Sequence, residues 1–222
     1  MKRTKLSDRT LPNYSKGEEI FNMVSHIVGG ALGIVALVLC IVTAARDHSV
    51  AGVLSSIVYG VTLITLYSMS SIYHGLRPGM AKKVFQVLDH CTIYFLIAGS
   101  YTPVLMVALR PNYPVIAWIL FGFVWGLAAI ACTLTAIDLK KFSLMSIICY
   151  LLMGWCIVFF FPQTYKVVGM TGVALLLAGG ISYTIGSVLY AIGKKKKWVH
   201  SIFHLFILLG SILQFFAILI VL

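Results

Sequence analysis

The chain has 222 residues, of which 60% are hydrophobic and only 10% are charged. Water-soluble globular domains average about 45–50% apolar and about 25% charged residues, so this composition excludes an ordinary soluble fold. It also excludes a disordered chain, because disordered segments are polar and charged. The net charge is +11, from 17 Lys and Arg against 6 Asp and Glu. Because the basic residues fall between apolar runs, we interpret the charge as a sign of membrane topology and expect no nucleic-acid partner.

Seven apolar runs follow a polar N-terminal segment, residues 1–19, and each is long enough for a transmembrane helix of about 20 residues. The runs cover approximately residues 20–44, 50–75, 84–109, 114–137, 142–161, 167–192 and 198–221. No linker between them is long enough to fold, so we expect one domain over residues 20–222, an all-α bundle of seven transmembrane helices. The first run is too long for the apolar core of a signal peptide. We expect segment 1–19 to be cytoplasmic and mobile.

Lysines and arginines alternate in number between successive connections. The N-terminal segment and the connections after the second, fourth and sixth runs contain fourteen, whereas the other connections contain three and the C-terminus none. The positive-inside rule therefore predicts a cytoplasmic N-terminus and a C-terminus outside the cell. The run Lys194–Lys197 is also a candidate site for anionic lipid head groups, although a topology anchor explains it equally well.

Two further patterns are structural signals. The five cysteines are odd in number, lie inside apolar stretches and form no CxxC, so we interpret them as buried thiols. They are Cys40, Cys91, Cys132, Cys149 and Cys156. The spacings Gly29-x-x-x-Gly33 and Gly122-x-x-x-Gly126 permit close helix packing.

Ionisable side chains inside a membrane are costly, so each is a candidate functional group. Asp89 is the one acid clearly inside an apolar run, and five histidines lie inside or at the edges of runs: His26, His74, His90, His200 and His204. With the predicted orientation, these residues come from four helices and lie within about two turns of the cytoplasmic surface. One shared depth is what a single site requires, although snorkelling at the interface is a competing reason.

The spacing of these residues is typical of a zinc site. His200 and His204 are four residues apart, so both rings project from one helix face, as in many helical zinc chelates; a packed histidine pair is the alternative. Ser70 and His74 share a face in the same way. Three neutral histidines and one water form the ligand set of a catalytic zinc. Asp89 is either a fourth ligand or the group that holds this water.

The pattern Ser70-x-x-x-His74, Asp89 early in the third run and His200-x-x-x-His204 early in the seventh resembles the haemolysin III family. This family is grouped with the progestin and adiponectin receptors and, more widely, with the alkaline ceramidases. The stretch from Gly17 to His26 and the stretch from Asp89 to Pro103 also resemble it. The resemblance extends from about residue 15 to the end of the chain.

The resemblance implies a seven-helix bundle with zinc held by His74, His200 and His204. It further implies Asp89 on the metal-bound water and Ser70 near the metal as a hydrogen-bond donor. In the receptor branch such a site is associated with the hydrolysis of ceramide-like amides. The short chain resembles the bacterial branch, so we expect a multi-pass protein of the bacterial plasma membrane. For His26 and His90 we expect a structural or outer-sphere role, with direct ligation as the alternative.

We therefore predict a zinc-dependent hydrolase of lipid amides or esters, whose substrate enters from the cytoplasmic leaflet. Asp89 would act as the base, and Ser70 would stabilise the oxyanion. The alternative is a non-enzymatic membrane protein, either a cytolysin or a sensor of membrane homeostasis, in which zinc is structural or regulatory. A retinal protein is excluded because a Schiff base needs a lysine deep in a span, and every lysine here lies at a boundary or in a loop.

Overall fold

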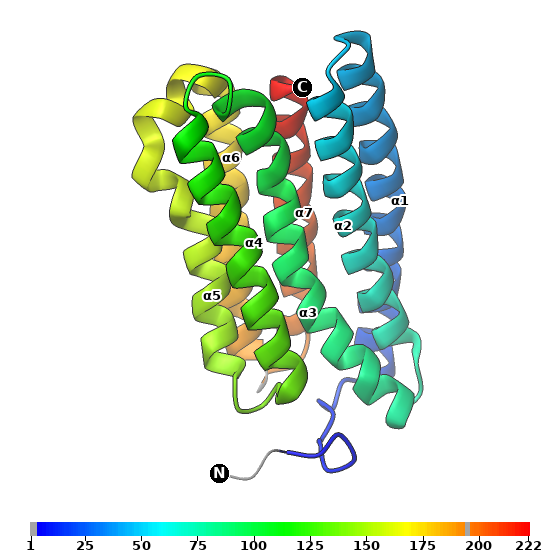
Figure 1. Ribbon diagram of the computed structural model, residues 1–222. Helices are drawn as coiled ribbons and strands as arrows, with labels where there is room; N and C mark the ends of the chain where they lie inside the picture. Colours follow the sequence, from blue (N-terminus) through cyan, green and yellow to red (C-terminus); the bar gives the residue numbers. More distant parts are fainter. Residues whose placement is uncertain (1–3, 194–195) are drawn as a thin grey trace.

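The computed structural model describes residues 4–193 and 196–222. Lys2, Arg3, Lys194 and Lys195, which the charge count includes, lie outside the described residues. Within the described part every regular element is a helix, and the helices form one bundle (Figure 1). They are α1 (Lys16–Arg46), α2 (Val50–Gly75), α3 (Met80–Pro103), α4 (Pro114–Ile137), α5 (Ser143–Trp155), α6 (Phe161–Gly193) and α7 (Val199–Val221). A π-helical segment, Val104–Leu109, continues α3, and a short 3₁₀ segment, Cys156–Phe160, follows α5.

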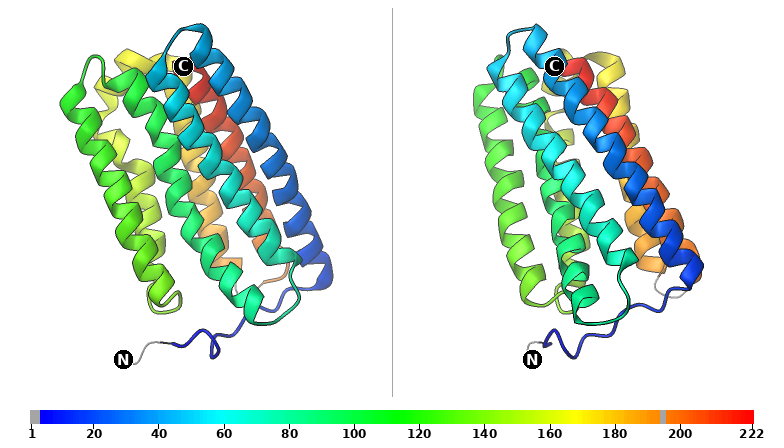
Figure 2. Two further views of the ribbon diagram at one scale, coloured as in Figure 1. Left: turned by 45° about the vertical axis from the view of Figure 1, so that its right-hand side comes forward. Right: turned by 90° about the vertical axis from the view of Figure 1, so that its right-hand side faces the viewer.

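The arrangement places α3 at the centre of the bundle. This helix is the most buried of the membrane-length helices, and it contacts α2, α4, α5 and α7. Helix α7 contacts α1, α3 and α6, and Figure 2 shows α1 lying along α2 and α7. The N-terminal ends of α1, α3 and α7 and the C-terminal end of α2 therefore meet at one end of the bundle.

Helix α1 begins four residues before the expected boundary at residue 20, because a capping box fixes its first turn. The Ser15 hydroxyl accepts the Glu18 backbone N–H at 3.3 Å, and the Glu18 carboxylate accepts the Ser15 N–H at 2.8 Å. Each bond satisfies a backbone donor that would otherwise have no partner at the start of a helix. As a result Glu18 and Glu19 belong to the helix and not to a polar tail.

Six helical stretches in the described residues are long and apolar enough to cross a membrane. Five of them correspond to expected runs. The runs expected at 142–161 and 167–192 instead form one helical stretch of 51 residues, Ser143–Gly193. Figure 1 shows the chain reversing its direction inside this stretch, so that α5 and α6 run in opposite directions. The backbone leaves the helical conformation at Gly169 inside this stretch, with φ of +74°, a conformation that a residue without a Cβ adopts readily.

The described part of the N-terminal segment packs against the helix ends, which corrects the expectation of a mobile tail. The Thr4 backbone N–H donates to the Asp138 carboxylate at 2.8 Å, and Lys83 donates to the Ser7 carbonyl. The Asp138 carboxylate also accepts the Lys141 N–H at 3.1 Å. These hydrogen bonds, with that from Thr4 the largest, lower the pKa of Asp138 to about 2.

The two small-residue spacings have different environments. A Cβ added to Gly29 would lie 2.6 Å from the Tyr67 ring, and one on Gly33 would lie 3.1 Å from Ile64, so this pattern brings α1 close to α2. A Cβ on Gly122 or Gly126 would meet no atom of the described residues within 4 Å. Only the first spacing therefore mediates helix packing within the described chain. All five cysteines are free, in agreement with the expected thiols.

The glycine contacts predict opposite changes in the free energy of unfolding for two alanine substitutions, Gly29→Ala and Gly126→Ala. Gly29→Ala forces the Tyr67 ring or the helix backbone to move, and overpacking of this kind costs about 1–3 kcal/mol. Gly126→Ala meets open space, and loss of glycine from a helix interior is expected to stabilise by about 0.5–1 kcal/mol. Unfolding of both variants in detergent, followed by circular dichroism, measures the difference. Equal stability of the two variants would contradict the packing role of Gly29.

Candidate metal centre

The structure brings together three histidines from two helices that are distant in the sequence. His74 is the penultimate residue of α2, and His200 and His204 lie in the first two turns of α7. One ring nitrogen of each lies within 4.8 Å of the others. All three side chains are buried, and the His200 and His204 ring centroids are 4.7 Å apart. Their four-residue spacing places both rings on one face of α7.

The ring nitrogens have the arrangement that a metal ion requires. His200 Nε2 and His204 Nε2 are 3.0 Å apart. Two nitrogens bound to one tetrahedral zinc, at about 2.0–2.1 Å each, lie about 3.3 Å apart. His74 Nε2 and His204 Nδ1 are buried without a hydrogen-bond partner among the described residues. Three buried imidazoles whose nitrogens lie this close together could hold a metal ion, and this ligand set suits zinc as well as copper, nickel or iron.

Asp89 and Ser70 lie on the wall of a cavity that also includes His200. The Ser70 hydroxyl is buried and has no partner among the described residues. Asp89, early in α3, does not join the three-histidine group, and one carboxylate oxygen lies 3.5 Å from His90 Nδ1. This placement speaks against Asp89 as a fourth ligand of the three-histidine group.

The two remaining histidines of this end differ in their environment. His90 Nδ1 donates to the Gln86 carbonyl, so His90 Nε2 accepts from the Tyr190 hydroxyl, each at 2.8 Å. Both ring nitrogens of His90 therefore have hydrogen-bond partners within the protein, an arrangement that fits a structural role. The His26 ring lies 3.9 Å from the His204 ring between centroids and edge-on to Tyr67. Both of its nitrogens are buried without a partner in the described part of the chain, so His26 borders the centre without joining the three-histidine group.

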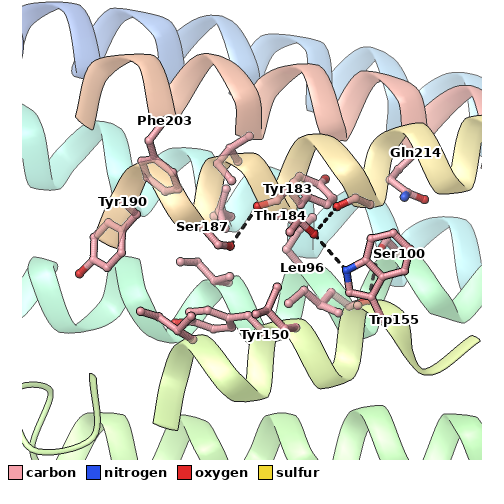
Figure 3. Close-up of a pocket in the computed structure, with 18 of the residues that line it drawn as sticks. Leu96, Ser100, Tyr150, Trp155, Tyr183, Thr184, Ser187, Tyr190, Phe203 and Gln214 are labelled. Atoms are coloured by element: carbon pink, nitrogen blue, oxygen red, sulfur yellow. Dashed lines mark hydrogen bonds between the residues drawn. The ribbon is translucent and has the colours of Figure 1, made fainter. Parts of the chain in front are cut away.

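The cavity extends from the histidines far into the bundle. Its wall continues from His200 to Gln214 on α7, a rise of about 21 Å at 1.5 Å per residue. Figure 3 shows Tyr190 and Phe203 towards one end of the cavity and Trp155 and Gln214 towards the other. The empty space, including its open mouth, is about 1340 Å³. The wall between the two ends combines aliphatic side chains, such as Ile93, Leu96 and Ile207, with tyrosines and small hydroxyl side chains, such as Tyr150, Tyr183, Thr184 and Ser187.

Three residues that the sequence did not single out lie against the histidines. The Tyr14 ring stacks on His200 with centroids 4.7 Å apart, and burial raises the pKa of this phenol above its usual range. Glu19 hydrogen-bonds to His74, and Lys82 to Glu19, each at 2.7 Å. No spacing rule connects residues so far apart in the sequence. The available signal was the stretch from Gly17 to His26, which resembles the family and includes Glu19.

Comparison with known proteins identifies the family. Residues 14–215 match the family described as haemolysin-III related, and this range includes every residue of the centre. The chain is 37% identical to Hemolysin-3 of Bacillus cereus over 202 residues, which are 91% of this chain and 90% of the relative. It is 36% identical to the Hemolysin-3 homolog of Bacillus subtilis (strain 168), over 91% of this chain and 93% of the relative.

The similarity reaches a human protein as well. The chain is 27% identical to the human monocyte to macrophage differentiation factor over 172 residues, 72% of this chain and 67% of the relative. The protein therefore belongs to the haemolysin III family, as the sequence motifs indicated, and it is a multi-pass helical membrane protein.

The three-histidine group predicts stoichiometric metal binding. We expect close to one zinc per chain in the detergent-purified protein and none in the double variant His200→Ala/His204→Ala, because one imidazole cannot hold the ion alone. His48→Asn is the matched control. His48 is exposed and has φ of 52°, which asparagine tolerates. Elemental mass spectrometry after purification without chelators gives the ratio. Zinc retained by the double variant would contradict this site.

Proposed function

We propose that this protein is a zinc-dependent membrane hydrolase that cleaves an amide or ester bond in a lipid. The observation that supports the proposal best is a single cavity that connects His200, Ser70 and Asp89 with a long, largely apolar chamber. Such a cavity suits a substrate with one polar carbonyl and one extended chain. The chain would lie among the aliphatic side chains, and its carbonyl would lie at the histidines.

The chemistry follows from the positions of the polar groups. His74, His200 and His204 would hold zinc, which supplies a Lewis acid for the scissile carbonyl and an activated water. Asp89 would accept the proton of the attacking water and later deliver it to the leaving nitrogen or oxygen. The Ser70 hydroxyl, which has no other partner among the described residues, would donate to the developing oxyanion. The aliphatic wall would exclude bulk water from the chamber.

A second candidate is a membrane-active protein without turnover, and the names of two relatives favour it. Both are described as haemolysins, at 37% and 36% identity. In that case the histidines would hold a structural or regulatory zinc, and the protein would permeabilise membranes or sense their state. The two candidates differ in one observable, the release of a product from a lipid.

Removal of the proposed base tests the hydrolase. Asp89→Asn retains the three histidines but loses the proton acceptor, so we expect unchanged zinc content and a loss of turnover of about 10²–10⁴-fold. The assay is release of fatty acid from a panel of N-acyl and O-acyl lipids, followed by mass spectrometry. Asp47→Asn, at an exposed position after α1, is the control and should retain activity. Wild-type protein that contains zinc but releases no acid from any of these lipids would favour the second candidate.

For the topology we propose seven crossings, with the N-terminus in the cytoplasm and the C-terminus outside the plasma membrane of a bacterial cell. The reversal inside Ser143–Gly193 supports two crossings in that stretch, and the beginning of α1 and the end of α7 lie at opposite ends of the bundle (Figure 1). The lipid head would then enter from the cytoplasmic leaflet, where the histidines lie.

Thiol labelling of intact cells tests this orientation. An impermeant maleimide should label His48→Cys and a cysteine added after Leu222 in intact cells, because both would lie at the outer end. Asp8→Cys should react only after permeabilisation. The wild-type chain is the control for background labelling, since four of its five free thiols are buried. If the C-terminal cysteine and Asp8→Cys both react only after permeabilisation, the chain crosses the membrane six times.

A further inference from the structure

Glu19 makes a direct contact with the candidate metal centre that neither the fold nor the proposed chemistry requires. One of its carboxylate oxygens lies 2.7 Å from His74 Nδ1, across 55 residues of sequence. The other lies 2.7 Å from the Lys82 ammonium. The His74 side chain is fully buried in this contact, and that of Glu19 is 20% exposed.

This contact determines which nitrogen of His74 faces the other histidines. An ionised carboxylate only accepts hydrogen bonds, so the proton of neutral His74 must be on Nδ1. The lone pair is then on Nε2, the His74 nitrogen that is buried without a partner in the described residues. The neutral imidazole therefore presents its ligating nitrogen to the centre and its donor to Glu19.

Lys82 holds the carboxylate in place from the opposite side. Its ammonium donates to Glu19, to the Leu76 carbonyl at 3.0 Å and to the His74 carbonyl at 3.5 Å. Lys82 is only 3% exposed, so its charge needs the Glu19 carboxylate as a counterion. The α2 carbonyls lie at the C-terminal end of that helix, where a cation is also favoured. Through these hydrogen bonds, Lys82 connects the Glu19 carboxylate to the end of α2, which contains His74.

The neighbouring carboxylate has a different function, which separates the two residues experimentally. Glu18 closes the capping box with Ser15 and accepts the Trp198 backbone N–H at 2.6 Å. Consecutive helix residues point about 100° apart, so Glu18 and Glu19 face different partners. Helix capping therefore accounts for Glu18 but not for Glu19.

We propose that Glu19 is a positioning residue of the metal centre, which orients His74 and fixes its tautomer, and that Lys82 holds Glu19 in place. The inference rests on the proposed metal centre but not on lipid hydrolysis. Removal of a carboxylate behind a histidine ligand typically weakens metal binding by 10–100-fold. A glutamine at position 19 can still occupy the space, so the expected loss concerns affinity more than folding.

The experiment compares two matched pairs of variants in detergent. Glu19→Gln and Lys82→Met remove the proposed contacts, whereas Glu18→Gln and Lys83→Met change the adjacent residues, which do not contact His74. Each protein is freed of metal, and its zinc affinity is measured by competition with a chromophoric chelator. Cobalt absorption spectra of the loaded proteins report the ligand geometry. Thermal unfolding of the metal-free proteins reports the fold.

We expect zinc affinity to fall about 10–100-fold in Glu19→Gln, with an altered cobalt spectrum. Lys82→Met should weaken zinc binding in the same direction, and both control variants should bind as the wild type does. Folded Glu19→Gln with wild-type affinity and spectrum would overturn the inference, even if the wild type hydrolyses lipids. If zinc affinity falls in Glu19→Gln but the wild type releases no product from any lipid, the result supports the inference and contradicts the proposed hydrolase function. A wild type that binds no zinc would overturn both.

A measurement on the wild type remains decisive if Glu19→Gln does not fold. Nuclear magnetic resonance of isotope-labelled histidine, with His74 assigned from His74→Asn, distinguishes the two imidazole tautomers in the metal-free protein. The inference requires the proton of His74 on Nδ1. A proton on Nε2 would overturn it.

Discussion

Three imidazole rings, those of His74, His200 and His204, are buried together at one end of an apolar bundle. A buried nitrogen without a partner costs free energy, and the lipid surroundings of a membrane helix offer no water to satisfy it. His74 Nε2 and His204 Nδ1 are in this position among the described residues. The capped first turn of α1 brings Glu19 to the other ring nitrogen of His74, Nδ1. A metal ion would satisfy nitrogens that no side chain here satisfies.

The sequence was sufficient to predict the parts of the structure that follow from helical periodicity. His200 and His204 had to share a face of α7 because they are four residues apart, and apolar length gave most helix positions. The shared depth of His74, Asp89 and the α7 pair followed from counting residues from the helix ends. These inferences need only the rise and repeat of an α-helix. They led to the histidine group and to the family, and Asp89 and Ser70 lie on the wall of the adjoining cavity.

Other features depend on contacts between distant segments, and the sequence did not reveal them. Glu19 was counted as part of a polar tail, and Lys82 as a topology charge, because their mutual contact depends on how α1, α2 and α3 meet. The N-terminal segment likewise lacks apolar periodicity, yet its Tyr14 stacks on His200. The hydropathy pattern separates the runs 142–161 and 167–192, but it does not reveal the backbone between their helices, which contains a 3₁₀ segment, Cys156–Phe160, and a positive φ at Gly169.

The surroundings of the histidines bear on the choice between a catalytic and a structural metal. A structural zinc site is closed by a fourth protein ligand, whereas the three-histidine group in the described chain contains no cysteine or carboxylate. The Ser70 hydroxyl and both His26 nitrogens also lack partners among the described residues, and both residues line the cavity, so unpaired polar atoms remain at the histidine end of a largely apolar chamber. A purely structural ion would gain nothing from such a chamber. A lipid carbonyl at this position would accept a hydrogen bond from the Ser70 hydroxyl, while its chain would fill the space along α7.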